Sequence, residues 1–243
     1  VINKLNDFYK NEFSNIGRSI HSLAVNATNK FEETRMSVKN FINAKFKEEI
    51  IFTKNATEAI NLVATTFGQQ NIKEGDEIII TELEHHSNYV PWHFIRESKK
   101  AIIKFAPINE DGDIIIDKLK ELITSKTKII AVTHLSNVTG TIVPIKEIVE
   151  IAHKKNIPVL VDGCQSVPHI SVDVSDLDCD FYAFSGHKVY GPTGVGILYA
   201  KKKWLEKLPP YIGGGAMISE VKKDKIPYAP LPEKYEAGTM PTA

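Results

Sequence analysis

Several protein classes are excluded by what this sequence of 243 residues lacks. It has two cysteines, Cys164 and Cys179, so neither a disulfide framework nor a cysteine-based metal site can be built from it. A reducing, cytoplasmic compartment is therefore expected, although a removed organellar transit peptide would leave no trace. The 30 lysines and arginines balance 30 aspartates and glutamates. This balance gives no electrostatic footprint for nucleic acid or an anionic membrane.

Long apolar runs and metal-binding motifs are also missing. No stretch approaches the length of a transmembrane span, and Val1–Lys10 lacks a secretory pattern. The eight histidines form no HExxH or comparable zinc pattern. We therefore expect no metal site, no membrane partner and no nucleic-acid partner.

The composition that remains is that of a globular domain, with 42% hydrophobic and 25% charged residues. Helical patterns occur at Thr57–Phe67, Asp117–Ile123 and Lys146–Lys155. They alternate with seven short apolar, β-branched runs, most without polar alternation, as in a parallel sheet covered on both faces. These predicted strands are Ile50–Thr53, Glu77–Thr81, Ala101–Phe105, Lys128–Thr133, Pro158–Asp162, Phe181–Ser185 and Val195–Ala200. The alternation predicts an α/β fold over residues 47–208.

The two flanking segments differ from this central region. Residues 1–46 are predicted to be helical, with a polar break at Asn15–Arg18 and a long helix from about Asn29 to Ala44. Residues 209–243 are rich in proline and glycine and are predicted to be an extended loop. Because this loop ends without a closing element, we expect a truncated chain.

Lys188 follows a predicted strand that ends at Ser185, in a loop that also holds His187 and is bracketed by glycines. Strand ends of an open α/β sheet are where ligands usually bind. A lysine amine in its neutral form can make a Schiff base with an aldehyde cofactor. The alternative is a solvated loop lysine, which most lysines are.

Asp162 ends another apolar strand, in the segment Val-Leu-Val-Asp-Gly-Cys-Gln. A buried aspartate costs several kcal/mol unless it is paired, so it requires a cationic partner. The protonated pyridine nitrogen of pyridoxal phosphate (PLP) is such a partner. Gln165, three residues later, is in reach of the phenolic oxygen of that cofactor. Alternatively, Asp162 caps the turn that follows.

A phosphate site is indicated where the first strand leads into a helix, at residues 53–59. The amides of Ala56 and Thr57, with the Thr57 hydroxyl, would face an anion at this helix N-terminus. Simple capping by Asn55 or Thr57 is the alternative. The two interpretations are compatible, because a capped helix N-terminus still has backbone amides that can bind a ligand in the site.

Two further strand ends carry polar side chains. His85 lies in Glu-Leu-Glu-His-His-Ser-Asn, where an imidazole can stack on an aromatic ring and shuttle a proton near neutral pH. The alternative is a surface histidine. Asn137 lies in Thr-His-Leu-Ser-Asn-Val-Thr-Gly, after the fourth strand. Five strand ends therefore present polar groups.

These five segments together resemble the signature segments of the class V aminotransferase superfamily. They are most similar to the group II (SUF-type) cysteine desulfurases and their selenocysteine lyase relatives, from about Asn15 to the end of the chain. The resemblance implies the large domain of PLP fold-type I, a mostly parallel seven-stranded sheet flanked by helices. It also implies that the small C-terminal domain is missing.

The resemblance assigns roles at matching positions. Lys188 resembles the lysine that attaches the cofactor, and His85 the histidine that stacks on its ring and takes part in acid–base steps. Asp162 resembles the partner of the pyridine nitrogen, and Gln165 that of the phenolic oxygen. The residues that resemble the phosphate ligands are Thr57, Ser185 and His187. Asn137 resembles the residue that contacts the cofactor ring or the substrate carboxylate.

The segment Glu236–Thr239 is similar to the family loop whose threonine reaches the phosphate in the other subunit. Thr239 thus implies a homodimer with shared sites. Two departures stand out. Gly17-Arg18-Ser19 lacks a histidine that relatives have before the arginine, and Cys164 replaces an alanine. Cys164 is either a nucleophile beside the cofactor or a packing residue, as a free cysteine often is.

The implied activity is conversion of L-cysteine to L-alanine, with sulfur carried as an enzyme persulfide to an acceptor protein for iron–sulfur cluster assembly. Lys188 or His85 would move protons. The family's sulfur-accepting cysteine and substrate-carboxylate arginine lie downstream of Thr239, so this chain alone is expected to be inactive. The alternatives are a selenocysteine lyase or other class V enzyme, such as an epimerase or kynureninase-like lyase, and a non-catalytic PLP-domain scaffold.

Overall fold

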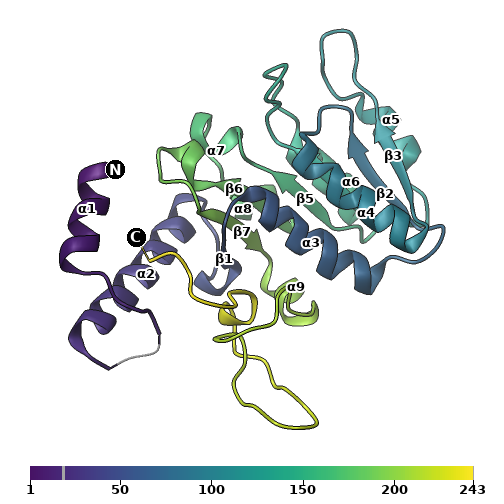
Figure 1. Ribbon diagram of the computed structural model, residues 1–243. Coiled ribbons are helices and arrows are strands. Elements are labelled where there is room, and N and C mark those ends of the chain that lie inside the picture. The colour runs from purple at the N-terminus through teal and green to yellow at the C-terminus, as the bar shows by residue number, and fades with distance from the viewer. Residues whose placement is uncertain (18–19, 243) are drawn as a thin grey trace.

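A seven-stranded sheet forms the centre of the computed structural model, which describes residues 1–17 and 20–242 (Figure 1). Arg18 and Ser19, part of the tripeptide that departs from the family pattern, lie outside the described residues. The strand order is β1-β7-β6-β5-β4-β2-β3. The strands are β1 Ile50–Thr53, β2 Glu77–Thr81, β3 Ile102–Ala106, β4 Thr127–Thr133, β5 Val159–Asp162, β6 Phe181–Ser185 and β7 Gly196–Ala200. Every predicted strand is confirmed to within one residue at each end.

The strand directions bring five strand ends to one edge of the sheet. The pairs β2–β3, β2–β4, β4–β5 and β5–β6 are parallel. Strand β7 runs antiparallel to both β1 and β6. Strands β1 to β6 therefore all point the same way, and the ends of β1, β2, β4, β5 and β6, which carry the predicted polar groups, lie at one edge. The predicted mostly parallel sheet is confirmed.

Helices cover both faces of the sheet, which separates two hydrophobic clusters. One face packs against α3 (Ala56–Asn71), α4 (Val90–Lys99) and α9 (Lys202–Lys207). The other packs against α2 (Ser22–Phe41), α5 (Ile116–Leu122), α6 (Ile145–His153), α7 (Ser166–His169) and α8 (Val174–Leu177). In β2, Ile78 and Ile80 belong to the first cluster and Ile79 to the second, because successive side chains point to opposite faces. Figure 1 shows α3 and α4 side by side across one face.

The three central helices predicted from the sequence are confirmed as α3, α5 and α6, whereas α4 was not predicted. Pro91 lies in the first turn of α4, where a missing N–H costs no hydrogen bond. The predicted start of the long N-terminal helix was wrong. Helix α2 begins at Ser22 rather than near Asn29, because His21 Nδ1 accepts a hydrogen bond from the Ala24 N–H at 3.3 Å and caps it there.

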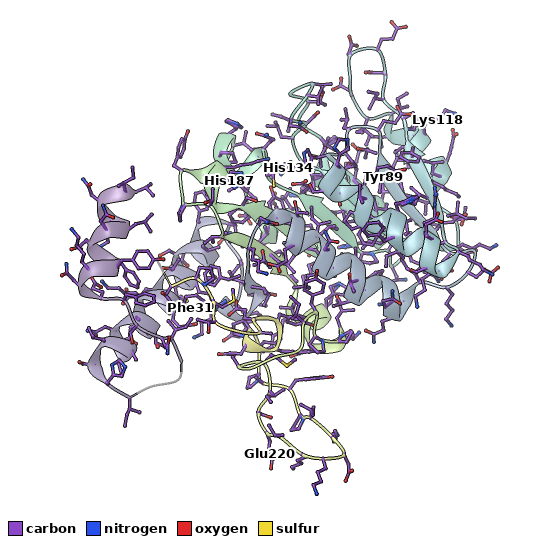
Figure 2. All side chains as sticks on the ribbon, viewed as in Figure 1. Phe31, Tyr89, Lys118, His134, His187 and Glu220 are labelled. Carbon is purple, nitrogen blue, oxygen red and sulfur yellow. The ribbon has the colours of Figure 1, made fainter. Side chains whose placement is uncertain are left out.

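The chain outside the sheet and its helices is short and mostly irregular. Helix α1 spans Ile2–Asn11. The described residues include the 3₁₀ turns η1 Lys47–Glu49, η2 His86–Asn88, η3 Gly186–Val189 and η4 Glu233–Tyr235. The last segment makes a long loop that projects from the body, with Glu220 labelled on it in Figure 2, as the extended-loop prediction requires. No described helix combines the length and apolar content needed to cross a membrane.

Candidate functional site

A pocket of about 320 Å³ opens at the edge where the five strand ends meet. That volume is in the range of small-molecule sites. Figure 2 labels His134 and His187 at this edge. Nine of the ten predicted site residues line the pocket: Ala56, Thr57, His85, Asn137, Asp162, Gln165, Ser185, His187 and Lys188. Asn55, Ser87, Thr133, Leu135 and Cys164 line it too.

Asp162 is a buried carboxylate without a cation. It is 3% exposed, and its Oδ1 accepts a hydrogen bond from the Cys164 N–H at 3.0 Å. Asp162 Oδ1 therefore caps the turn that follows the strand, which was the alternative role predicted from the sequence. Within residues 1–17 and 20–242, the carboxylate forms no ion pair. A buried carboxylate in this state favours a cationic ligand in the pocket that it lines.

Uncharged groups support the strand that ends at Asp162. The Tyr182 hydroxyl lies 2.9 Å from His134 Nδ1 and 2.6 Å from Ser166 Oγ. Burial raises the pKa of Tyr182 and lowers that of His134 to about 4, so both are neutral near pH 7. A Cβ atom on Gly163 would lie 2.0 Å from Tyr182 Cε1. The glycine after Asp162 is therefore required by the tyrosine ring.

The helix N-terminus of α3 forms one wall of the pocket. Asn55 caps it by accepting a hydrogen bond from the Glu58 N–H at 2.8 Å. The Ala56 N–H donates to Ser185 Oγ at 2.9 Å, so the prediction that this amide faces an anion is wrong. This hydrogen bond positions the Ser185 hydroxyl, which can still donate its own proton to a ligand. In the part of the chain that the structure describes, the Thr57 N–H has no protein acceptor.

His85 has a defined ring orientation. Its Nδ1 lies 3.2 Å from the Ser87 N–H and 2.7 Å from Ser87 Oγ. A backbone N–H can only donate, so Nδ1 is the acceptor and the neutral ring carries its proton on Nε2. The exposed ring at the rim of the pocket thus keeps Nε2 for a ligand or substrate.

Lys188 lies in η3, directly after β6, and is half-buried. The Gly186 N–H donates a hydrogen bond to Val195 O at 2.9 Å, and Gly186 O accepts one from the Gly191 N–H at 2.9 Å. These bonds hold the turn that presents the lysine. Tyr190, just after it, has φ of 64° and ends the turn.

Thr239 does not reach the pocket of its own chain. It lines a separate cavity of about 380 Å³, together with Arg35 and Glu236. This position agrees with a role at another chain's site, which stays a prediction.

Cys164 lines the pocket, but its surroundings disfavour the thiolate that a nucleophile requires. Burial and the nearby Asp162 raise the pKa of Cys164 well above its usual range. Cys179 is fully buried, and burial raises its pKa likewise. Of the two alternatives for Cys164, the structure favours the packing residue. Among the described residues, no three His, Cys, Asp or Glu side chains group as metal ligands.

The residues of the pocket fit PLP. Asp162 offers the buried anion that a pyridinium requires, and Lys188 lines the same pocket. The Thr57 N–H at the start of α3 offers a donor for phosphate, and hydroxyl and imidazole groups are supplied by Ser185 and His187.

Sequence reasoning missed Glu84, which does not line the pocket but bonds to Thr133, which does. Glu84 Oε1 accepts a hydrogen bond from the Thr133 N–H at 2.8 Å. The signal available in the sequence was an acidic residue beside the His-His pair after an apolar strand.

Comparison with known proteins places this pocket in a family. The model of the family described as aminotransferase class V matches residues 1–243. A cysteine desulfurase of Synechococcus elongatus is 48% identical over 239 residues, which are 98% of this chain and 38% of that protein. A probable cysteine desulfurase of Halalkalibacterium halodurans is 49% identical over 239 residues, 98% of this chain and 59% of that protein. The chain thus spans less than two thirds of either relative.

A solved structure has the same fold. The apo structure of a cysteine desulfurase from Thermococcus onnurineus superposes with a TM-score of 0.94 at 37% identity. The match covers 99% of this chain and 60% of that one. This similarity agrees with the predicted fold-type I large domain.

Proposed function

Because the chain belongs to the aminotransferase class V family, whose members depend on PLP, we propose that the protein is a cysteine desulfurase and that this chain supplies its cofactor site. Its substrate would be L-cysteine, its products L-alanine and a persulfide sulfur. An acceptor protein would receive the sulfur for iron–sulfur cluster assembly. The observation that carries the proposal is the buried Asp162, which forms no ion pair with a described residue, in one pocket with Lys188.

When bound, PLP acts as an electron sink that makes the α-carbon of an amino acid reactive. Asp162 would keep the ring nitrogen protonated, which that role requires. Lys188 would attach the cofactor, and Gln165 would bind its phenolic oxygen. The phosphate would be held by Thr57, Ser185 and His187, and the ring or substrate carboxylate by Asn137.

Proton transfer is assigned to two residues. The amine of Lys188 would take a proton from the substrate α-carbon. His85 would stack on the ring and deliver a proton through Nε2, since Nδ1 is occupied by the Ser87 N–H.

Sulfur transfer needs a thiol other than those of this chain. Cys164 and Cys179 are buried and have raised pKa values, so neither fits the acceptor role. A homodimer is part of the proposal, supported by the position of Thr239 outside the pocket of its own chain.

The function is tested by alanine formation. Protein loaded with PLP is incubated with L-cysteine and an added thiol, which accepts the sulfur as its persulfide while alanine carries away the proton. Because the added thiol takes the place of the acceptor cysteine that this chain lacks, wild type is expected to form alanine under these conditions, and Lys188→Ala none. Lys54→Ala is the matched control, since Lys54 is an exposed lysine that follows β1 and its substitution should leave the rate unchanged. Equal rates in wild type and Lys188→Ala would refute the proposal.

A further inference from the structure

A chain of buried hydrogen bonds lies behind the strand end that carries Asp162. Its members are the imidazole of His134, labelled in Figure 2, the Tyr182 phenol and the Ser166 hydroxyl, all of them buried. The Tyr182 oxygen lies 2.9 Å from His134 Nδ1 and 2.6 Å from Ser166 Oγ. Ser166 Oγ in turn donates to Gly163 O at 3.1 Å. The chain therefore ends on the residue that directly follows Asp162.

The direction of each hydrogen bond follows from the acceptor at this end. A carbonyl oxygen can only accept, so the single proton of the Ser166 hydroxyl is directed to Gly163 O. Ser166 Oγ then accepts the proton of Tyr182, and the Tyr182 oxygen accepts one from His134 Nδ1. Burial lowers the pKa of His134 to about 4 and raises that of Tyr182, so both are neutral near pH 7. His134 therefore carries its single ring proton on Nδ1.

The Gly163–Cys164 peptide unit joins this chain to Asp162. Its oxygen accepts hydrogen bonds from Ser166 Oγ and from the Val167 N–H, each at 3.1 Å. Its N–H, which belongs to Cys164, donates to Asp162 Oδ1 at 3.0 Å. Because a peptide unit is planar, bonds that fix its oxygen also fix the direction of its N–H. The Ser166 hydroxyl therefore helps to determine where the carboxylate of Asp162 is held.

We propose that Ser166 is a positioning residue of the cofactor pocket, which acts through the Gly163–Cys164 peptide to hold the Asp162 carboxylate in place for the ring nitrogen of PLP. The inference rests on the proposed cofactor. The attraction between the carboxylate and a pyridinium weakens with distance. A carboxylate that is already fixed also loses less freedom when the cofactor binds. Ser166 itself makes and breaks no covalent bond in this role.

A double-mutant cycle on PLP affinity tests the link to Asp162. Ser166→Ala is expected to weaken PLP binding by about three- to tenfold, because one of the two hydrogen bonds to the Gly163 oxygen is lost. In an Asp162→Asn background the same change should weaken binding by less than about twofold, because the charge that Ser166 positions is gone. Ser37→Ala is the control and should leave affinity unchanged, since the exposed Ser37 hydroxyl donates to a backbone carbonyl of its own helix at 2.9 Å.

The ring proton of His134 gives a second reading, in the cofactor-free protein. Nitrogen-15 NMR of labelled histidine distinguishes the two neutral tautomers. Wild type is expected to carry the proton of His134 on Nδ1, and Ser166→Ala on Nε2. In the variant the Tyr182 hydroxyl loses its acceptor and donates to His134 Nδ1 instead. A serine that only filled space in the core would leave this tautomer unchanged.

The outcomes separate the inference from the proposed function. If PLP binds with an absorbance change that depends on Lys188, but Ser166→Ala weakens binding equally with and without the Asp162 carboxylate, or not at all, the role of Ser166 is refuted and the cofactor site stands. If wild type does not bind PLP, both fail. Should Ser166→Ala not fold, the wild-type spectrum decides. A proton on His134 Nδ1 supports the inference. A proton on Nε2 overturns it, since the Ser166 proton would then point to Tyr182 and not to the peptide.

Discussion

Arg35 Nη1 and Nη2 each lie 2.8 Å from a different carboxylate oxygen of Glu236, forming a buried bidentate ion pair. The guanidinium also donates to Ile50 O at 2.7 Å and lies over the ring of Phe52, 4.6 Å from its centroid. The Phe52 N–H donates to Glu236 Oε1 at 2.7 Å. This pair therefore fixes the segment that carries Thr239 against β1 and α2.

Arg35→Ala is expected to lower the free energy of unfolding by about 3–5 kcal/mol, because it leaves the Glu236 carboxylate buried without its cation. Urea unfolding followed by circular dichroism measures the change. Lys47→Ala is the control. It removes an exposed partner of Glu32, at 3.3 Å, and should cost no more than about 1 kcal/mol. Equal effects of the two substitutions would contradict the structural role of the pair.

Gly163→Ala should destabilise the protein by about 1–3 kcal/mol, because the added methyl group meets the buried ring of Tyr182. The ring cannot yield without breaking its bonds to His134 and Ser166, so the strand end that carries Asp162 must move. Affinity for PLP should fall as well. Gly213→Ala has nothing within 4 Å of its Cβ and should leave stability and affinity unchanged. Thermal unfolding and PLP titration give the two readings.

Asp180 stabilises the opposite edge of the sheet in a pH-dependent way. Burial alone would raise its pKa, but hydrogen bonds from His153 at 2.8 Å and Trp204 at 2.7 Å, with Lys201 and Lys203, lower it to about 2. The folded pKa lies below the unfolded one, so the stabilisation is complete above about pH 4 and lost as pH falls toward 2. Asp180→Asn should therefore cost roughly 2 kcal/mol at pH 7.

Urea unfolding of wild type and Asp180→Asn from pH 7 to pH 2.5 checks this sign. The difference between the two proteins should shrink as the pH falls below 4. Asp111→Asn, at an exposed loop position, should stay close to wild type throughout. A difference that stays constant with pH would show that the charge of Asp180 is not responsible.

Asp162→Asn should separate stability from cofactor binding. The amide oxygen can still accept the Cys164 N–H, and the buried charge is removed, so the cofactor-free protein should be as stable as wild type or more stable. PLP affinity should fall at least about tenfold, because the pyridinium loses its anion, and tenfold corresponds to about 1.4 kcal/mol. Unfolding of cofactor-free protein and PLP titration test the two halves. A destabilised variant with unchanged affinity would contradict the assigned role.

The sequence predicted the strands well because each is a short β-branched run with covered faces, such as Phe181–Ser185. It also predicted which strand ends carry polar groups, and parallel pairing brought those groups together. Helix α4 was missed since Pro91 reads as a breaker when its place in a first turn is unknown. The start of α2 was missed because a histidine cap at His21 is not a usual signal.

Within the site, the limits of sequence reasoning concern contacts between segments. That the Ala56 N–H bonds to Ser185, 129 positions later, depends on the approach of β6 to the start of α3. The three donors to Glu84 likewise come from different segments, namely the end of β2, the turn η2 and the end of β4. Local patterns identify which residue types can bind a cofactor, while the distribution of donors and acceptors among them requires the packed structure.

The central claim is that Lys188 attaches PLP, and covalent trapping tests it most directly. Protein incubated with PLP is reduced with borohydride, digested and mapped by mass spectrometry. We predict that the added mass lies on Lys188, is absent from Lys188→Ala and is unchanged in Lys54→Ala. Stoichiometric label on a different lysine of wild type, or full labelling of Lys188→Ala, would contradict the account.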